Sequence, residues 1–158
     1  MIEDPVEHFF ASDESRLLVL PTLDALEEQA ENADRTRSVA SNVIESLRGS
    51  EVMRMAATSE LGGVESSILA MGRELEAVAA RCPSTAWCLW NHLAVFHLFV
   101  GTLGPEHQGF LEEIVREGRW VSFPAGAGSG VYGRIEGNEA ILTGKATFGT
   151  GSRYADYC

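Results

Sequence analysis

The feature that most restricts the fold of this chain is a run of 24 residues, from 82 to 105, without a formally charged side chain. Its length alone is enough for one membrane-spanning helix. However, it opens with Pro-Ser-Thr and closes with Gly-Thr-Leu-Gly-Pro, which are typical of a helix start and a helix end. It also contains Asn91, His92 and His97, whose polar side chains are costly to place in lipid. The run therefore predicts a buried helix of a soluble protein, with Ser84 as its N-cap.

Composition and charge set the broad class of the protein. The chain has 158 residues, of which 45% are apolar, so it is long enough and hydrophobic enough to bury one ordinary core. Its 12 Lys and Arg against 23 Asp and Glu give a net charge of −11, which argues against nucleic acid and anionic membrane as partners. The three cysteines lack the spacing of a zinc or redox motif, the histidines lack ligand spacing, and no secretory signal opens the chain. These patterns predict reduced thiols, a cytoplasmic location and no metal.

Hydrophobic periodicity predicts a series of helices up to Gly118. Pro21 fits the first of them only near its first turn or as a break. The pair Gly62 and Gly63 indicates a loop in the middle of the series. Beside the uncharged run, apolar residues at helical spacing predict helices at residues 15–33, 36–48, 51–57, 65–81 and 105–117.

The residue pattern changes after Gly118 from one typical of helices to one typical of extended segments. Gly137 and Asn138 form a dipeptide that suits a tight hairpin turn. Helices followed by strands indicate an α+β protein, with a helical domain over residues 1–118 and an incomplete antiparallel β domain over residues 119–158. So few strands make a poor independent sheet, and we therefore expect the chain to be the front part of a longer protein. The expected strands are residues 120–124, 131–136, 139–148 and 153–157.

The order of these segments, and three local stretches within them, resemble the acyl-CoA dehydrogenase superfamily. The stretches are SELGGVESS, CPSTAWCLWNH and FPAGAGSGVYGRIEGNEAILTGKATFGTGSRYADY, and the resemblance covers essentially the whole chain. It is nearest to the branch that contains the two-component flavin-dependent monooxygenases. It implies an N-terminal helical domain, the beginning of an antiparallel β-barrel domain, and flavin (FAD or FMN) as the cofactor. It also implies that the C-terminal four-helix bundle is absent from this chain, and that the full-length protein is a homotetramer.

The resemblance implies a first set of flavin contacts in a glycine-rich stretch. Residues 123–130 match the family's Thr-Glu-Pro-Gly-Ala-Gly-Ser-Asp motif at its central Gly-Ala-Gly-Ser, which makes Phe123 and Ser129 candidate cofactor-binding residues. The motif's threonine, glutamate and aspartate are absent here, which weakens an acyl-CoA substrate in particular. Glycine lets the main chain approach phosphate oxygens closely, but such a cluster is alternatively a plain turn.

A second set of flavin contacts is implied at residues 148–151, where an aromatic residue is followed by Gly and Thr as in the monooxygenase branch. The resemblance makes Phe148 a candidate to pack on the flavin ring and Thr150 a candidate to hydrogen-bond its edge. The alternative is an apolar strand position and a threonine that favours β structure.

Two residues of the uncharged run are candidates for the substrate side of the flavin. In the monooxygenase branch a histidine on this helix lines that side, so the resemblance makes His92 a candidate catalytic residue that would orient or deprotonate a phenol. The alternative is a satisfied core histidine, which is also our expectation for His97. Trp87 is a candidate substrate-binding residue, and the alternative is that it packs helices together.

The resemblance implies a flavin-dependent oxidoreductase, and by preference a two-component monooxygenase. In that system a separate flavin reductase supplies reduced flavin, and the monooxygenase uses O2 to hydroxylate an aromatic or similar small substrate in a dry pocket. One alternative is an acyl-CoA dehydrogenase, whose catalytic base would lie outside these residues. The other alternative is that the chain by itself is a non-catalytic fragment that lacks half of the flavin site.

Overall fold

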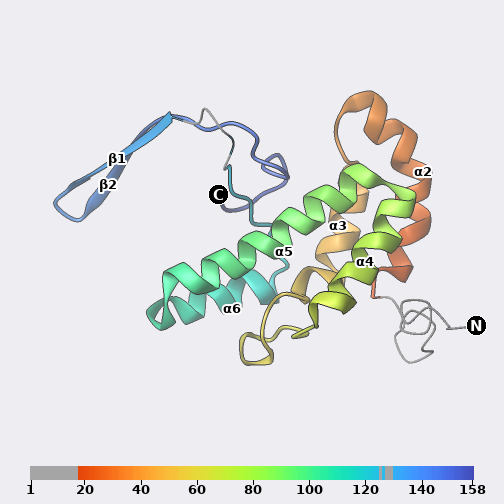
Figure 1. Ribbon diagram of the computed structural model, residues 1–158, viewed down its shortest axis with the longest axis horizontal. Coiled ribbons are helices and arrows are strands. Elements are labelled where there is room, and N and C mark those ends of the chain that lie inside the picture. The colour runs from red at the N-terminus through yellow and green to blue at the C-terminus, as the bar shows by residue number, and fades with distance from the viewer. Residues whose placement is uncertain (1–17, 125, 127–129) are drawn as a thin grey trace, which may run out of the picture.

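The computed structural model describes residues 18–124, 126 and 130–158 of the chain. Helices come first and a two-stranded antiparallel sheet follows, which confirms the predicted α+β order (Figure 1). The α-helices are α2 (Leu20–Thr36), α3 (Ser41–Arg48), α4 (Ile68–Arg81), α5 (Pro83–Leu103) and α6 (Gln108–Arg116). The 3₁₀ helices are η1 (Glu51–Arg54), η2 (Ser59–Leu61) and η3 (Pro105–His107), and the strands are β1 (Gly130–Glu136) and β2 (Glu139–Lys145).

The uncharged run forms α5, which packs along α4 and also contacts α2 and η1 (Figure 1). Its buried side chains recur at helical spacing, as at Leu89, Leu93 and Phe96, so one face of α5 lies in the core. By length and composition, α5 is the one helix of the described residues that is long and apolar enough to cross a membrane. Only 33% of its most apolar 18-residue window is buried. The helix is therefore a core helix on one face and exposed on the other, rather than buried all round as the sequence indicates.

A side chain from α4 binds the two residues that precede α2. Pro21 lies in the first turn of α2, where its missing N–H costs no hydrogen bond, and the helix has no side-chain cap of its own. Instead, the Glu74 carboxylate accepts the N–H groups of Leu18 at 2.7 Å and Val19 at 2.9 Å. Glu74 is only 4% exposed, so these two bonds satisfy a buried polar group and join α2 to α4.

Two helix starts differ from the expected ones. α5 begins at Pro83 with Cys82 as its N-cap and without a side-chain cap, so Ser84 lies inside the first turn and the predicted Ser84 cap is wrong. Because proline has no N–H, its presence at the first position leaves one donor fewer for a cap to satisfy. α4 begins three residues later than expected, because the Ser67 hydroxyl caps it by accepting a first-turn N–H at 3.1 Å.

Two of the four predicted strands do not form. Residues 120–124 and 153–157 meet only at a single parallel bridge, between Val121 and Tyr157. The first N–H groups of the earlier segment donate to a carboxylate and to an imidazole instead of to a neighbouring strand. The third predicted strand is real but ends early, at Lys145.

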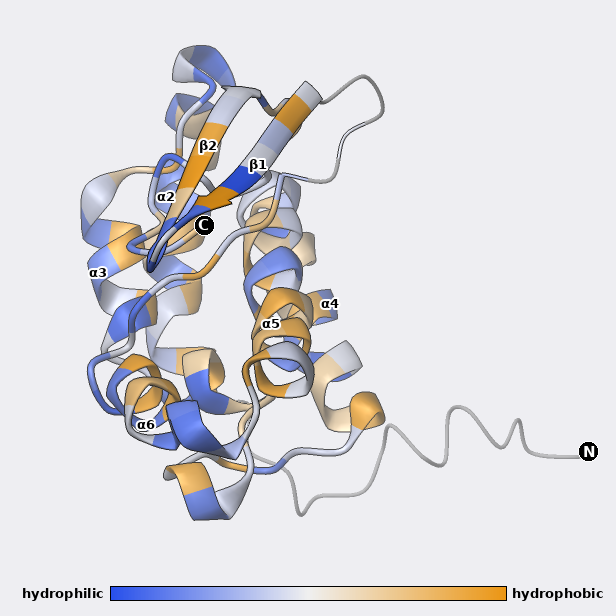
Figure 2. Ribbon diagram, turned by 90° about the vertical axis from the view of Figure 1, so that its left-hand side faces the viewer, coloured by the Kyte–Doolittle hydropathy of each residue, from blue (hydrophilic) through white to orange (hydrophobic). Residues whose placement is uncertain are grey.

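The strands β1 and β2 form a hairpin that projects from the helical body in Figure 1 and lies in front of it in Figure 2. Gly137 has a φ of 63° in the turn, in agreement with the turn predicted there. Directly opposite residues of an antiparallel pair share a face of the sheet. One face is exposed although it is apolar, with Ile135 at 75% and Leu142 at 71%. The register places on this face only apolar residues and glycines, namely Val131, Gly133, Ile135, Ala140, Leu142 and Gly144.

Candidate functional site

His92 lies inside the protein and joins α5 to two other segments. Its side chain is 2% exposed; the Val121 N–H donates to Nδ1 at 3.1 Å, and Nε2 lies 3.0 Å from the Met53 carbonyl oxygen. Because Nδ1 accepts a hydrogen bond, the ring proton is on Nε2, which donates to the Met53 oxygen. Burial lowers the pKa of His92 from 6.5 to about 4, although the bond to Met53 acts in the opposite direction. The imidazole is therefore neutral at neutral pH.

Both ring nitrogens of His92 are occupied by main-chain groups, and this bears on its predicted role. A catalytic imidazole needs a nitrogen within reach of the substrate. Here one nitrogen would first have to leave Met53 or Val121. The Trp120 indole, which is fully buried, also packs against the ring, with centroids 5.4 Å apart. The catalytic role of His92 stays a prediction, and its contacts favour the alternative of a satisfied core histidine.

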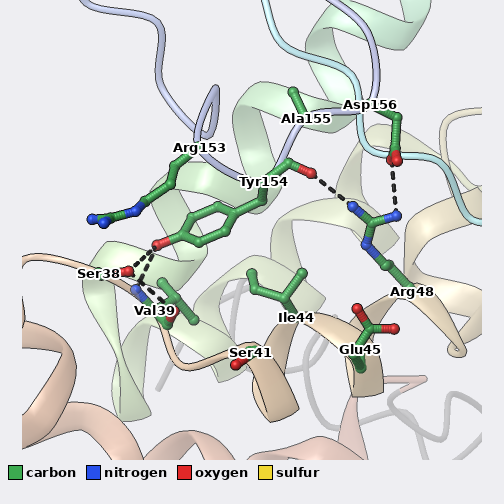
Figure 3. Close-up of a pocket in the computed structure, with 10 residues that line it drawn as sticks. All are labelled: Ser38, Val39, Ser41, Ile44, Glu45, Arg48, Arg153, Tyr154, Ala155 and Asp156. Carbon is green, nitrogen blue, oxygen red and sulfur yellow. Dashed lines mark hydrogen bonds and ion pairs between the residues drawn. The ribbon is translucent and has the colours of Figure 1, made fainter.

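Asp156 joins residues 153–157 to α3 and to the start of residues 120–124. Its carboxylate accepts the Trp120 N–H at 2.7 Å and lies 2.8 Å from Nη1 of Arg48. Arg48 also donates from Nη2 to the Tyr154 carbonyl at 2.7 Å, beside a cavity of about 490 Å³ (Figure 3). The side chains of Arg48 and Asp156 are each 21% exposed, so water screens this ion pair less than an open surface pair.

The two predicted cofactor segments lie side by side. The Ser122 hydroxyl donates to the Thr150 carbonyl at 2.8 Å, and the Gly126 N–H donates to the Thr147 carbonyl at 3.2 Å. A Cβ at Gly126 would lie 2.6 Å from that same Thr147 oxygen, so glycine permits the close approach. The structure thus joins two segments that the sequence predicts separately. We refer to the joined segments, residues 122–124, 126 and 147–151, as the platform.

The platform presents two aromatic rings to the outside. Phe148 is 81% exposed and Phe123 is 46% exposed. Phe148 has a φ of 59°, which is uncommon for a bulky residue, and a tight turn holds it there because the Thr150 N–H donates to its carbonyl at 3.0 Å. Residues held in sparsely populated backbone regions cluster at ligand sites. The platform therefore holds an apolar ring outward in a fixed position.

Trp120 and Gly151 make the contact between the platform and the helical body. A Cβ at Gly151 would lie 2.9 Å from the indole Nε1 of Trp120 and 3.8 Å from the Cβ of Cys88 on α5. Gly151 also has a φ of 76°, so both the conformation and the space require glycine here. Burial raises the pKa of the Cys88 thiol, which keeps it protonated and suits a packing role.

The platform fits one wall of a flavin site. Its two exposed rings can pack against the face of a flat aromatic cofactor, and Thr150 adds a hydroxyl beside Phe148. The exposure of Phe148 shows that the described chain leaves its ring uncovered, so the opposite wall would come from elsewhere. Ser129, the remaining predicted cofactor residue, lies outside the described residues. Within the described part of the chain, no group of three His, Cys, Asp or Glu could hold a metal ion.

Trp87 lies on the exposed face of α5. It is 60% exposed and stacks on Trp90, with ring centroids 5.0 Å apart and ring planes 23° apart. The two rings form one aromatic surface, and the substrate-binding role of Trp87 stays a prediction. His97 is also exposed and borders a cavity, so the core position expected for it is wrong.

Sequence reasoning missed three residues that build the site, namely Arg48, Ser122 and Asp156. Each acts on a partner far along the chain, and the Arg48 to Asp156 pair, for example, joins α3 to the segment after the platform. A polar residue inside a predicted strand, as at Ser122, is the one signal that was available.

Comparison with known proteins shows that the fold of this chain is shared with a solved structure. No protein-family model matches the chain, and the search of curated proteins gave no match. Among solved structures the chain is similar to the crystal structure of 3-HSA hydroxylase from Rhodococcus sp. RHA1, with a TM-score of 0.72 and 17% sequence identity. The alignment covers 90% of this chain and 37% of that hydroxylase, so the chain spans little more than a third of its length. This similarity shows a shared fold, and it agrees with the predicted α+β arrangement of helices followed by an antiparallel sheet.

Proposed function

We propose that this chain forms part of a flavin-dependent oxidoreductase, and that the whole protein is a two-component monooxygenase acting on an aromatic or similar small substrate. The observation that carries the proposal is the platform, in which hydrogen bonds join both predicted cofactor segments. The fold shared with a hydroxylase supports it. We also propose a helical domain over residues 1–118, a β domain from residue 119, a cytoplasmic location and assembly of several copies.

The residues of the platform would bind and orient the cofactor. Bound reduced flavin, supplied by a flavin reductase, would provide the activated oxygen for hydroxylation. Phe148 and Phe123 would pack on the ring system and exclude water from that side, and the Thr150 hydroxyl would hold a ring edge. Ser129 would hold a more polar part of the cofactor.

His92 and Trp87 would act from α5 in different ways. We propose that His92 positions the main chain of Val121, and through it Phe123, because its hydrogen bonds lead there. A direct role as a base toward a phenol would require it to release Met53 first. Trp87, with an exposed ring, would contact the substrate.

A flavin-binding measurement with a matched pair of aromatic substitutions tests this function. Binding of FMN and FAD is measured by the quenching of their fluorescence, with the 158-residue chain and with the longest product of its gene. Each protein is tested as wild type, as Phe148→Ala and as Tyr132→Ala. Tyr132 is the control because it is 77% exposed on the hairpin, away from the platform. Loss of one stacked ring is expected to weaken binding about fivefold for Phe148→Ala and to leave Tyr132→Ala unchanged.

The same preparation decides whether the flavin is used. With a flavin reductase and NADH, the longest product should couple O2 consumption to hydroxylation of a phenol. Absence of binding to both flavins by that product would overturn the proposal, and equal weakening by the two substitutions would remove the platform from it.

A further inference from the structure

A cavity of about 320 Å³ lies between α4 and α5, apart from the platform. Met71, Gly72 and Leu75 of α4 line it on one side, and Trp90, Leu93 and His97 of α5 line it on the other. His97 is five residues beyond His92, which places it about 140° further around the helix. The cavity therefore opens on a different face of α5 from the one that His92 presents to Val121.

Gly72 borders this cavity without contributing a side chain to it, and the residue is exposed. It lies inside α4, where glycine lowers helix stability relative to alanine. A glycine in a helix is commonly explained by a neighbour that approaches closely, yet a Cβ at Gly72 would meet nothing within 4 Å. The packing of α4 against α5 thus gives no reason for glycine, and a larger side chain at this lining position would take up space beside the cavity.

The lining of the cavity determines which molecules it suits. None of its eight lining residues carries a formal charge, although the chain has a net charge of −11. Trp90 forms part of one wall, and its ring stacks on that of Trp87 with centroids 5.0 Å apart. His97, which is exposed, supplies an imidazole among the lining residues. A charged molecule would lose its hydration here without a partner, whereas a flat neutral one would gain apolar contact.

We propose that the cavity between α4 and α5 binds a neutral aromatic molecule of one or two rings, with a ring beside Trp90 and over Gly72, and a hydroxyl group toward His97. The volume lies at the lower end of the range for ligand pockets, which limits the ring count. This inference goes beyond the proposed function because it requires neither flavin nor reductase, and it holds even if the platform binds no cofactor.

Phenol is the probe, and benzoate is its charged counterpart with the same ring. Amide NMR signals of the ¹⁵N-labelled 158-residue chain are followed during titration with each. Phenol is expected to shift signals of residues 68–75 and 90–97 with a dissociation constant of order 1 mM. Benzoate is expected to bind at least about tenfold more weakly because its charge is not paired in the cavity.

A substitution at Gly72 tests the site, and the same substitution at Gly109 is its matched control. Gly72→Leu is expected to weaken phenol binding by at least about tenfold because its side chain takes the place of the ring. Gly109→Leu is the control, since Gly109 lies on α6 and a Cβ there also meets nothing within 4 Å. If Gly72→Leu perturbs the fold, Gly72→Ala should give a smaller loss with an intact circular dichroism spectrum. Because the hydroxyl group of the ligand is placed toward His97, phenol should bind more tightly than toluene. The substitution His97→Leu should remove this difference in affinity.

Three outcomes would overturn the proposal. The first is that phenol shifts no NMR signal of the residues that line the cavity. The second is that Gly72→Leu binds phenol as well as the wild type does. The third is that the cavity signals shift with protein concentration alone and that this shift disappears in Gly72→Leu, which would make the cavity a contact between copies of the chain.

Discussion

The helical body and the β1–β2 hairpin contain the same kinds of apolar residues but use them differently. In the body, α5 buries one face against α4 and η1, and Leu89 is fully buried. In the hairpin the strands contact mainly each other, and Leu142 is 71% exposed on an apolar face. A two-stranded ribbon buries too little surface to be stable alone. The comparison indicates that stability comes from the body, and that the hairpin has an apolar face available for a further layer of structure.

The two segments of the platform flank the hairpin in the chain, and the platform takes its rigidity from the body. Val121 is held by His92, and Trp120 is held by Asp156, which is itself paired with Arg48. The exposed rings of the platform can therefore keep a fixed orientation although their own segments form no sheet. This arrangement suits a ligand-binding surface, because fixed groups lose little entropy when a ligand binds.

The largest expected difference between body and hairpin comes from one pair of leucine truncations. Leu89→Ala is expected to lower the free energy of unfolding by about 2–5 kcal/mol, because it removes a fully buried side chain and leaves a cavity. Leu142→Ala should change it by less than about 0.5 kcal/mol, because that side chain is 71% exposed. Urea unfolding followed by circular dichroism measures both. Similar losses would show that the hairpin is packed against something in solution, and the comparison would fail.

A second test follows how the stability of the fold depends on pH. Because the pKa of His92 falls from 6.5 to about 4 on folding, the unfolded chain binds more protons between these values. The contribution of His92 is complete above pH 6.5 and is lost as the pH falls toward 4, by a total of about 3 kcal/mol. Urea midpoints from pH 7.5 to pH 4 should therefore fall more steeply for the wild type than for His92→Gln. His97→Gln, which replaces an exposed histidine, serves as the control for the loss of an imidazole. Parallel curves for the wild type and His92→Gln would show that His92 is not buried as a neutral ring.

A third test compares two ion pairs. Asp156→Asn should lower the free energy of unfolding by roughly 1–3 kcal/mol, because it weakens the charged partner of Arg48 and the acceptor of the Trp120 N–H. Glu136→Gln breaks the hairpin pair with Arg134, whose side chains are 55% and 63% exposed, and should cost less than about 1 kcal/mol. Thermal unfolding at low and high salt measures both. Equal effects would mean that the two pairs are equally solvated, contrary to the comparison.

The sequence predicted the helices better than the extended segments, for a physical reason. Helical periodicity is local, and it found α3 and α5 because their buried residues repeat within one element. Residues 120–124 have the composition of a strand, but the first two N–H groups of the segment find their partners in side chains of residue 156 and of α5. No local pattern records such partners. The predicted strand over residues 139–148 likewise ends at Lys145, and Phe148 has a positive φ that its residue type does not favour.

The candidate site was predictable in its parts but not in its assembly. Resemblance of short stretches indicated Phe123 and Phe148, and the structure shows both rings exposed on adjoining segments. The hydrogen bond that joins these segments links Ser122 to a partner 28 residues away, so it could not be inferred from neighbours in the sequence. The catalytic role of His92 stays a prediction, and both of its ring nitrogens are bonded to main-chain groups.

The smallest expected effect concerns Ser122, and it tests whether the platform is one unit. Ser122→Ala removes the hydroxyl that donates to the Thr150 carbonyl and should lower global stability by about 1 kcal/mol. If this bond holds the platform together, amide hydrogen exchange of residues 147–151 should become at least about fivefold faster, because a 1 kcal/mol change in a local opening equilibrium has that size. Exchange in α4 should change only as far as global stability does. Thr143→Ala is the control, since Thr143 lies on the exposed hairpin and should alter neither region. Unchanged exchange at residues 147–151 in Ser122→Ala would show that the two cofactor segments are held independently, and the body alone would then account for their orientation.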